Sequence, residues 1–277
     1  MNQLQCRDRK LDLTSPAVMG ILNITPDSFS DGGEYNELDS AMGHVGLMVG
    51  QGADIIDVGG ESTRPGSDPV TEDEELRRVI PVLERAIPEF PETIFSIDTT
   101  KYRVAQKALD CGVHIVNDIS GLQREPRLAD LCAERGAGYI LMHSKGNPKT
   151  MQDNPRYNDV VDEVHTFFER QAALAKGKGV QNIILDPGIG FGKSLEHNLT
   201  LLSNLDAFGD LGYPLLVGAS RKSMLGEILD GREVDGRLAG TVAVHYHAMM
   251  KGAKIIRVHD VRQATDSVMV YNALAKT

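Results

Sequence analysis

The stretch Ala17-Val18-Met19-Gly20-Ile21-Leu22 has no polar side chain and ends at the polar residue Asn23. A short run that is apolar on both faces is typical of a parallel β-strand covered on both sides. Seven further runs, most of them equally apolar, lie at 54–58, 93–97, 113–116, 139–142, 182–185, 214–217 and 254–258. The sequence therefore predicts eight buried parallel strands.

Helical patterns separate these runs, the clearest of them at 38–51, 72–87, 159–176 and 237–250. Thr71, followed by four acidic residues, predicts an N-cap with favourable negative charge in the first helical turn. Parallel strands need crossover helices, and eight strand–helix units favour a (β/α)8 TIM barrel over an open sheet. The segment 6–15 is predicted to form a small hairpin or cap. The whole chain, 1–277, is predicted to be a single domain with 1–16 as its N-terminal cap segment.

Composition excludes several classes of protein. The formal charge of −10 argues against nucleic acid as a partner, because phosphate binding needs a basic surface. The N-terminus has no apolar signal region, and no apolar run approaches the roughly 18 residues that span a bilayer, so a cytoplasmic protein without a membrane partner is predicted. The three cysteines, Cys6, Cys111 and Cys132, are too widely spaced to indicate a disulfide framework or a zinc site.

Polar residues stand at or just after the end of every predicted strand. The carboxyl ends of barrel strands meet at one rim, which is where the active sites of such enzymes lie. A single Asp or Asn at such a position is more often a helix cap, but eight strands ending in this way indicate a site. The candidates are Asn23, Asp57, Glu61, Arg64, Asp98, Asn117, Asp118, His143, Asp186, Ser220, Arg221, Lys222, Arg257 and His259.

These candidates include two chemical groups. Asp98, Asn117 and Asp186 offer the acceptors that a planar heterocycle with N–H and NH2 donors needs, and buried carboxylates require such donors or a cation. The second group supplies cationic donors suited to a diphosphate. It consists of Arg64, Lys222, Arg257 and His259.

The motifs that carry these residues resemble those of the dihydropteroate synthase family. Two long strings carry most of the resemblance, MGILNITPDSFSDGG at 19–33 and DVGGESTRPG at 57–66. Shorter ones are SIDT at 96–99, NDISG at 117–121, DPG at 186–188, SRKS at 220–223 and RVHD at 257–260. They follow the family's order and span nearly the whole chain from about Met19 onward.

The resemblance implies a role for each site residue. The pterin would be held or lined by Asp98, Asn117, Ile119, Met142, Asp186, Phe191, Gly218, Lys222 and Arg257, with the guanidinium stacked on the ring. The diphosphate would be bound by Asn23, Arg64, Arg257 and His259. The p-aminobenzoate pocket would consist of Phe29, Thr63, Pro65, Phe191, Lys222 and Ser223. The catalytic set would be Asp98, Lys222, Arg257, His259 and Arg64.

The reaction implied is the condensation of 6-hydroxymethyl-7,8-dihydropterin diphosphate with p-aminobenzoate, without a protein nucleophile. Asn23 would help to place Mg2+, the one cofactor expected, and the loops 23–33 and 62–67 would close over the small-molecule substrates. The broad apolar face of the helix 237–250 fits either a homodimer interface, as the family resemblance implies, or core packing. Two alternatives remain, a pterin-dependent methyltransferase and a catalytically silent pterin-binding paralogue. The intact loops argue against both.

Three further expectations concern individual side chains. Asp57 and Glu61 are predicted to support the site rather than touch substrate, and Asp57 is expected to anchor the Gly59–Gly60 turn. His143 is open between a structural and a functional role. Ser144 and Lys145 depart from the usual family residues, which leaves the role of their loop undefined.

Overall fold

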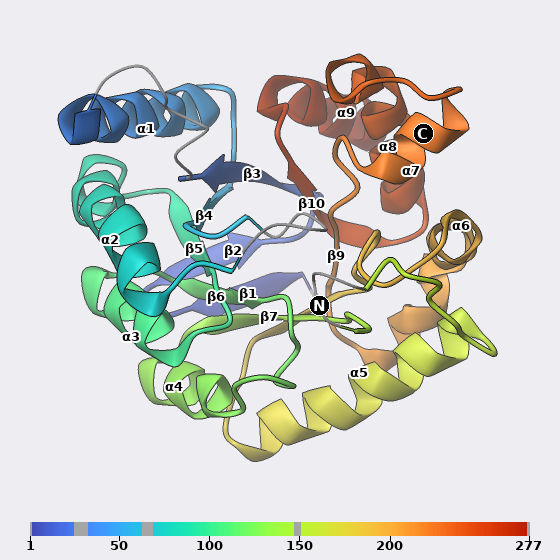
Figure 1. The fold of residues 1–277 in the computed structure, drawn as a ribbon, viewed down its shortest axis with the longest axis horizontal. Coiled ribbons are helices and arrows are strands. Elements are labelled where there is room, and N and C mark those ends of the chain that lie inside the picture. The colour runs from blue at the N-terminus through green and yellow to red at the C-terminus, as the bar shows by residue number, and fades with distance from the viewer. Residues whose placement is uncertain (1, 25–32, 63–68, 147–150, 276–277) are drawn as a thin grey trace.

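Eight parallel strands close into a barrel in the order β10-β3-β4-β5-β6-β7-β8-β9, as Figure 1 shows. The computed structural model describes residues 2–24, 33–62, 69–146 and 151–275, and for 33–36 the backbone alone. The barrel strands are β3 (Ala17–Asn23), β4 (Ile55–Gly59), β5 (Ile94–Asp98), β6 (Ile115–Asp118), β7 (Gly138–Met142), β8 (Ile183–Asp186), β9 (Leu215–Val217) and β10 (Ala253–Val258). The predicted (β/α)8 barrel is confirmed.

Helices surround the barrel strands. They are α1 (Gly33–Gly50), α2 (Glu72–Glu89), α3 (Tyr102–Cys111), α4 (Arg127–Arg135), α5 (Val160–Gly177), α6 (Leu195–Ser203), α7 (Ser223–Ile228), α8 (Leu238–Met250) and α9 (Val261–Leu274), with 3-10 turns η2 (Leu205–Leu211) and η3 (Val234–Arg237). The Thr71 side chain accepts a hydrogen bond from the Glu74 amide, as its predicted N-cap role requires. The helix expected at 38–51 begins earlier, at Gly33.

Several strands run further than the apolar pattern predicted. Gly59 pairs with Asp98, Asp98 pairs with Asn117, and Met142 pairs with Asp186, all within the barrel ladder. The ladder continues through polar residues because its hydrogen bonds join backbone groups whatever the side chain. The polar rim residues are therefore held on rigid strand ends rather than in loops.

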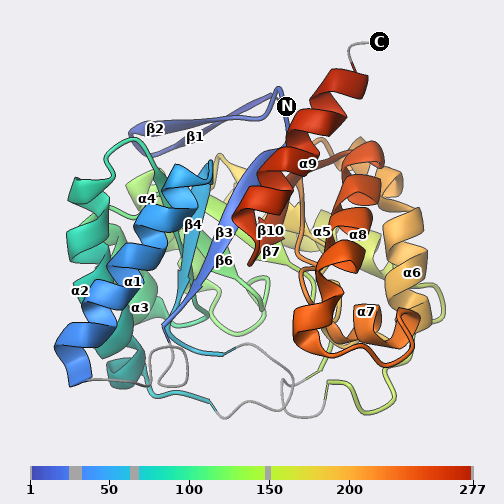
Figure 2. The ribbon, with the colours of Figure 1, turned by 90° about the horizontal axis from the view of Figure 1, so that it is seen from above.

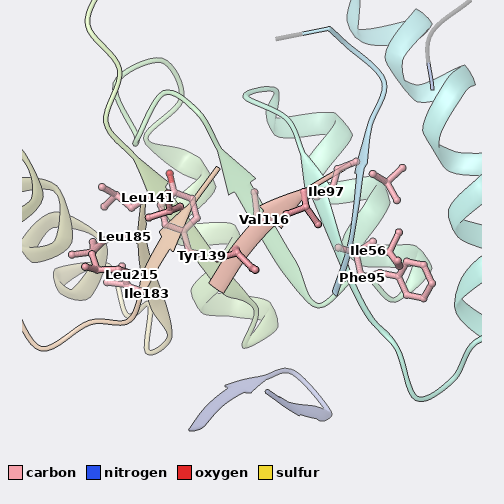
Figure 3. Close-up of a cluster of buried hydrophobic side chains, with 14 of the residues drawn as sticks. Ile56, Phe95, Ile97, Val116, Tyr139, Leu141, Ile183, Leu185 and Leu215 are labelled. Atoms are coloured by element: carbon pink, nitrogen blue, oxygen red, sulfur yellow. The ribbon is translucent and has the colours of Figure 1, made fainter. Parts of the chain in front are cut away.

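Alternate residues of each strand face opposite sides of the barrel wall. The outward set, which includes Ile56, Phe95, Val116 and Tyr139, packs beneath the helices, as Figure 3 shows. The inward set forms a separate apolar cluster at the amino-terminal end of the barrel, made of Ala17, Met19, Ile55, Ile94, Ile115, Ile140, Ile184, Leu216 and Ile255. Leu4, Cys6, Leu11 and Leu13 of the N-terminal segment complete this cluster.

A two-stranded hairpin, β1 (Gln3–Cys6) and β2 (Arg9–Asp12), closes the amino-terminal end of the barrel (Figure 2). The predicted cap is thus a hairpin, and it begins before the expected 6–15 segment. Gln5 N donates to Asn182 Oδ1 (3.3 Å) and Arg7 N to Gly136 O (2.8 Å), which attaches the hairpin to loops that precede strands. The assignment of all of 1–277 to a single domain stays a prediction. Within the described ranges, no helix has the length and apolar character needed to cross a membrane.

Candidate active site

The inward positions change character at the carboxyl-terminal end of the barrel. Ile55 belongs to the apolar cluster at the amino-terminal end, whereas Asp57, two residues further along the same face, is a fully buried carboxylate. Five of the other seven strands repeat this change, whereas β7 continues to Met142 and β9 is followed by Gly218. We call the resulting set the polar ring. It comprises Asn23, Asp57, Asp98, Asn117, Asp186 and Arg257.

Arg257 joins the members of the ring that come from β4 and β5. Its Nε donates to Asp57 Oδ2 and its Nη2 to Asp98 Oδ2, both at 2.7 Å. Asn117 Nδ2 donates to the same Asp57 oxygen at 3.0 Å. Asp57 was expected to anchor the Gly59–Gly60 turn, and that expectation was wrong: strand alternation directs its side chain into the barrel, where it holds Arg257 and Asn117.

Two carboxyl groups of the polar ring face the opening at the carboxyl-terminal end of the barrel, which we call the mouth. Asp98 is 5 % exposed, and its Oδ1 has no hydrogen-bond partner within the described part of the chain. Burial raises the pKa of Asp98, and the Arg257 guanidinium limits that rise. Burial also raises the pKa of Asp186, opposed first by Lys222, while Gly188 N donates to Asp186 Oδ1 at 2.7 Å. The ring thus presents acceptor oxygens at separate points of one mouth.

Lys222 enters this mouth from the β9–α7 loop, one residue before α7 begins. Its Nζ donates to the Ile189 carbonyl and lies 4.5 Å from the centroid of the Phe191 ring. Burial lowers the pKa of Lys222 to about 8, and the Asp186 carboxylate opposes this shift. Lys222 therefore lies close to both Asp186 and Phe191.

The lowered pKa of Lys222 makes a testable contribution to stability. The Lys222 ammonium loses its proton near pH 8 in the folded protein and near pH 10.5 in the unfolded chain. Between these two values, protonation of Lys222 favours the unfolded chain. We expect the free energy of unfolding of the wild type, relative to Lys222→Met, to increase as the pH rises from 8 to 10. Urea unfolding of both proteins at pH 7.5, 9 and 10 measures this. A difference that stays constant with pH would contradict it.

Other predicted residues also lie at the mouth. Ser220 Oγ is 3.0 Å from His259 Nδ1 and orients that ring. A Cβ added at Gly59 would be 3.8 Å from Asn23 Oδ1 and 3.5 Å from Asp98 Cβ, so the Asn23 amide oxygen lies beside the end of β5.

The remaining lining candidates are apolar residues, one glycine and Ser223. A Cβ added at Gly218 would be 3.6 Å from Arg257 Cβ, so its lack of a side chain leaves room over that residue. Met142 is buried, Ile119 is half-buried in the β6–α4 loop, and Ser223 is exposed as the first residue of α7. Four predicted residues lie outside the described residues, and their roles stay predictions: Phe29, Thr63, Arg64 and Pro65.

Three rim candidates do not enter the mouth. Asp118 accepts hydrogen bonds from Tyr139 and from the Ser120 and Leu122 amides behind the barrel wall. His143 packs edge-on against Phe167, with ring centroids 4.9 Å apart.

Both residues follow an inward-facing strand position, so alternation turns them outward. Arg221 forms a two-point ion pair with Asp260 that ties the β9 and β10 loops together.

The side chains of Glu61 and Lys145 also have structural partners. Glu61 and the buried Glu75 both accept from Lys101, which supports the prediction that Glu61 is not a substrate contact. Lys145 pairs with Glu163 at 2.9 Å and lies over the Tyr157 ring at 4.0 Å. The departure at Lys145 therefore stabilises the β7–α5 loop.

A cavity of about 900 Å³ lies at the other end of the barrel. Its lining includes Arg7 of the hairpin and His114 and Asn182, which precede β6 and β8. None of the predicted site residues lines it, and barrel enzymes place their chemistry at the opposite end. The polar ring, rather than this cavity, is the candidate active site.

The chain is similar to known proteins over nearly its whole length. The family model described as pterin binding enzyme matches residues 19–259. Dihydropteroate synthase of Escherichia coli K12 is 49% identical over 98% of this chain and 96% of its own length. The chain belongs to the dihydropteroate synthase family.

Solved structures of dihydropteroate synthases have the same fold. The Xanthomonas albilineans enzyme with 4-aminobenzoic acid superimposes with a TM-score of 0.93 at 41% identity, over 100% of this chain and 99% of the other. The same enzyme in complex with 7,8-dihydropteroate gives 0.89 at 38% identity, over 99% of both chains. The family resemblance inferred from the motifs is confirmed.

Proposed function

We propose that this chain condenses 6-hydroxymethyl-7,8-dihydropterin diphosphate with p-aminobenzoate, giving 7,8-dihydropteroate and pyrophosphate in folate biosynthesis. The observation that carries the proposal is the meeting of hydrogen-bond acceptors and cations in one barrel mouth. Asp98 and Asp186 are buried there beside Lys222 and Arg257. The relatives that bind 4-aminobenzoic acid and 7,8-dihydropteroate support the choice of substrates.

The acceptors of the ring would hold the pterin. Asp98 Oδ1, Asn117 and Asp186 accept from the ring N–H and amino groups, which offsets the cost of burying the two carboxylates. Lys222 donates to ring acceptor atoms from the other side. Gly218 leaves the Arg257 stem uncovered, so the guanidinium plane can lie against the heterocycle.

The reaction breaks the bond between the pterin methylene carbon and the diphosphate oxygen, and the electron pair leaves with pyrophosphate. Arg257, His259 and Arg64 stabilise the charge that develops on the leaving group. The resulting pterin cation lies near Asp98, whose carboxyl stabilises it electrostatically. The amine nitrogen of p-aminobenzoate then forms the new C–N bond and loses one proton to solvent.

The second substrate would occupy the space beside Phe191 and Lys222, whose ring and ammonium are already in contact. The ammonium suits an acceptor on either substrate, and the ring suits the benzoate face. Ser223 and the predicted residues Phe29, Thr63 and Pro65 would complete this pocket.

Mg2+ is the cofactor we propose, with Asn23 as its protein ligand. The Asn23 amide oxygen lies beside the end of β5, close to where the diphosphate would leave. One oxygen donor fits an ion that is held mainly by substrate phosphates and water, as Mg2+ commonly is. When bound, the ion neutralises negative charge on the diphosphate.

A turnover assay tests the proposal. We expect pyrophosphate release to require pterin diphosphate, p-aminobenzoate and Mg2+ together, and to stop when EDTA removes the metal. Release of pyrophosphate without p-aminobenzoate would indicate hydrolysis rather than condensation. Absence of turnover together with tight pterin binding would identify a silent paralogue. Methyl transfer from a methylated pterin would favour the methyltransferase alternative.

A homodimer through α8 is a further part of the proposal. Ala239, Ala243 and Met250 are exposed and Tyr246 is half-exposed, at intervals of three or four residues that share one helix face. Such an apolar face suits a self-complementary interface between two copies. Sedimentation velocity measures the oligomeric state. The cytoplasmic location stays a prediction from the sequence.

A further inference from the structure

The glycine-rich loop between β8 and α6 is wrapped around one buried lysine. Lys193 closes the loop and is 3 % exposed. Its Nζ donates to the Gly188 carbonyl at 2.9 Å and the Phe191 carbonyl at 3.1 Å. It also contacts His143 Nδ1 at 3.0 Å and the His143 carbonyl at 3.3 Å. The Lys193 amine thus joins the residue that follows β7 to two points of the loop.

All four of these contacts are with neutral groups. Burial lowers the pKa of Lys193 well below its usual range, opposed first by Asp186, so the contact between Lys193 Nζ and His143 Nδ1 can form with either nitrogen as the donor. Burial lowers the pKa of His143 to about 2, with the Lys193 charge acting in the same direction, so the imidazole is neutral. Burying an amine is costly unless its hydrogen-bonding groups are satisfied, and here the loop carbonyls satisfy them. A change in loop conformation would therefore break the hydrogen bonds of a buried amine.

Around this lysine, the backbone of the β8–α6 loop is in close contact with the backbone of the β7–α5 loop. A Cβ at Gly188 would lie 1.9 Å from the His143 carbonyl oxygen, and one at Gly192 would lie 2.1 Å from that of Lys145. Both glycines have a φ of 65°, which other residues rarely adopt. The loop therefore has little freedom to move away from β7 while Lys193 keeps its contacts.

The same loop carries the groups that touch Lys222. The Ile189 carbonyl accepts from Lys222 Nζ, and the Phe191 ring lies under that ammonium. The loop also includes Gly188, whose amide donates to Asp186. Through one loop, Lys193 is connected to Lys222, Phe191 and Asp186 without reaching the mouth itself.

We propose that Lys193 is a positioning residue, which fixes the 186–193 loop against β7 and so sets the place of Phe191 and Lys222 for the second substrate. This proposal rests on the proposed function for its substrates, and on the four contacts of Lys193 for its geometry. The lysine acts on the reaction through the loop and does not contact the reacting atoms.

Lys193→Met is the main test, since methionine keeps an unbranched stem and removes every donor. We expect kcat/KM for p-aminobenzoate to fall about 10- to 100-fold, because small misplacements of a substrate-binding group have effects of this size. Hydrogen exchange of the 186–193 segment should accelerate in the same variant. Lys193→Gln, which restores a donor for one carbonyl, should recover part of both losses.

Arg7→Met provides the matched control at the opposite end of the barrel. Arg7 Nη1 also donates to two backbone carbonyls, those of Leu109 (2.8 Å) and Val113 (2.9 Å). Its loss should lower Tm without changing kcat/KM or exchange at 186–193. All kinetics are measured well below the Tm of each variant.

The possible outcomes separate this proposal from the proposed function. A folded Lys193→Met protein with wild-type kcat/KM and exchange would overturn the positioning role, as would equal losses in the Arg7→Met control. If Lys193→Met does not fold, His143→Phe removes one contact and should still raise exchange at 186–193; unchanged exchange there would overturn the proposal. A wild type without turnover would overturn the proposed function, and the exchange measurements would still decide what Lys193 does to the loop.

Discussion

Replacement of Lys222 by methionine is expected to lower kcat/KM for pyrophosphate release about 100- to 1000-fold, the usual effect of removing one positioned electrostatic donor. Lys222 is held by the Ile189 carbonyl and the Phe191 ring beside the buried Asp186. Methionine keeps most of the aliphatic stem, so packing on Phe191 should persist while the charge and the donors are lost.

The effect on stability should be much smaller than the effect on activity. Lys222 keeps contact with solvent, and its burial already disfavours the charged form in the folded protein. Kinetics and a thermal melt on the same preparation separate the two effects. Lys251→Met, which removes a surface pair with Asp206 (3.3 Å), is the matched control and should change neither. Near-normal kcat/KM in a well-folded Lys222→Met protein would show that Lys222 is only a lysine at a helix start.

Much of the site could be predicted because it depends on strand ends. Asp98, Asn117 and Asp186 each terminate an apolar run, and a barrel brings all such ends to one mouth. The face on which each residue lies was harder to predict. Asp118 and His143 are one position beyond an inward residue, and a shift of one residue reverses the direction of a side chain in a strand.

Contacts between distant strands could not be predicted at all. Asp57 and Arg257 are 200 residues apart in sequence, and their hydrogen bond exists only because β3, between β4 and β10, closes the barrel. The role of Lys193 was not predicted either, because the positive φ angles of Gly188, Gly190 and Gly192 are what curl the loop around this lysine. Alternating glycines followed by a lysine were the available signal, but a sequence does not show which carbonyls turn inward.

Arg257→Met is expected to have the largest effect on stability, a loss of about 3–5 kcal/mol in the free energy of unfolding, which is typical when one partner of a buried ion pair is removed. Asp57 is 0 % exposed and Asp98 5 %, and both accept from this guanidinium at 2.7 Å. Without it, two carboxyl groups remain buried, and each already has one oxygen without a partner in the described part of the chain.

The loss in the free energy of unfolding should come mainly from the two carboxyl groups left without a cationic partner rather than from lost packing. Methionine occupies most of the space of the arginine stem. Arg257→Met combined with Asp98→Asn should therefore be more stable than Arg257→Met alone, because the second change removes one buried carboxyl group that has lost its cationic partner. Activity should be lost in both, because Arg257 is proposed to contact pterin and diphosphate. Denaturant unfolding of the single and double variants gives the coupling energy directly.

Arg103→Met is the control for removing a paired arginine at the surface. Its guanidinium pairs with Asp73 at 2.6 Å, but the side chain is 53 % exposed, and exposed pairs contribute about 0–1 kcal/mol. If Arg257→Met were no more destabilising than Arg103→Met, the Asp57 and Asp98 carboxyls would not depend on the guanidinium, and the network would be incidental to the fold. A large loss in the free energy of unfolding of Arg257→Met, partly reversed by Asp98→Asn, would show instead that this arginine stabilises two carboxyl groups inside the barrel. One of them, Asp98, is then in place to bind the substrate.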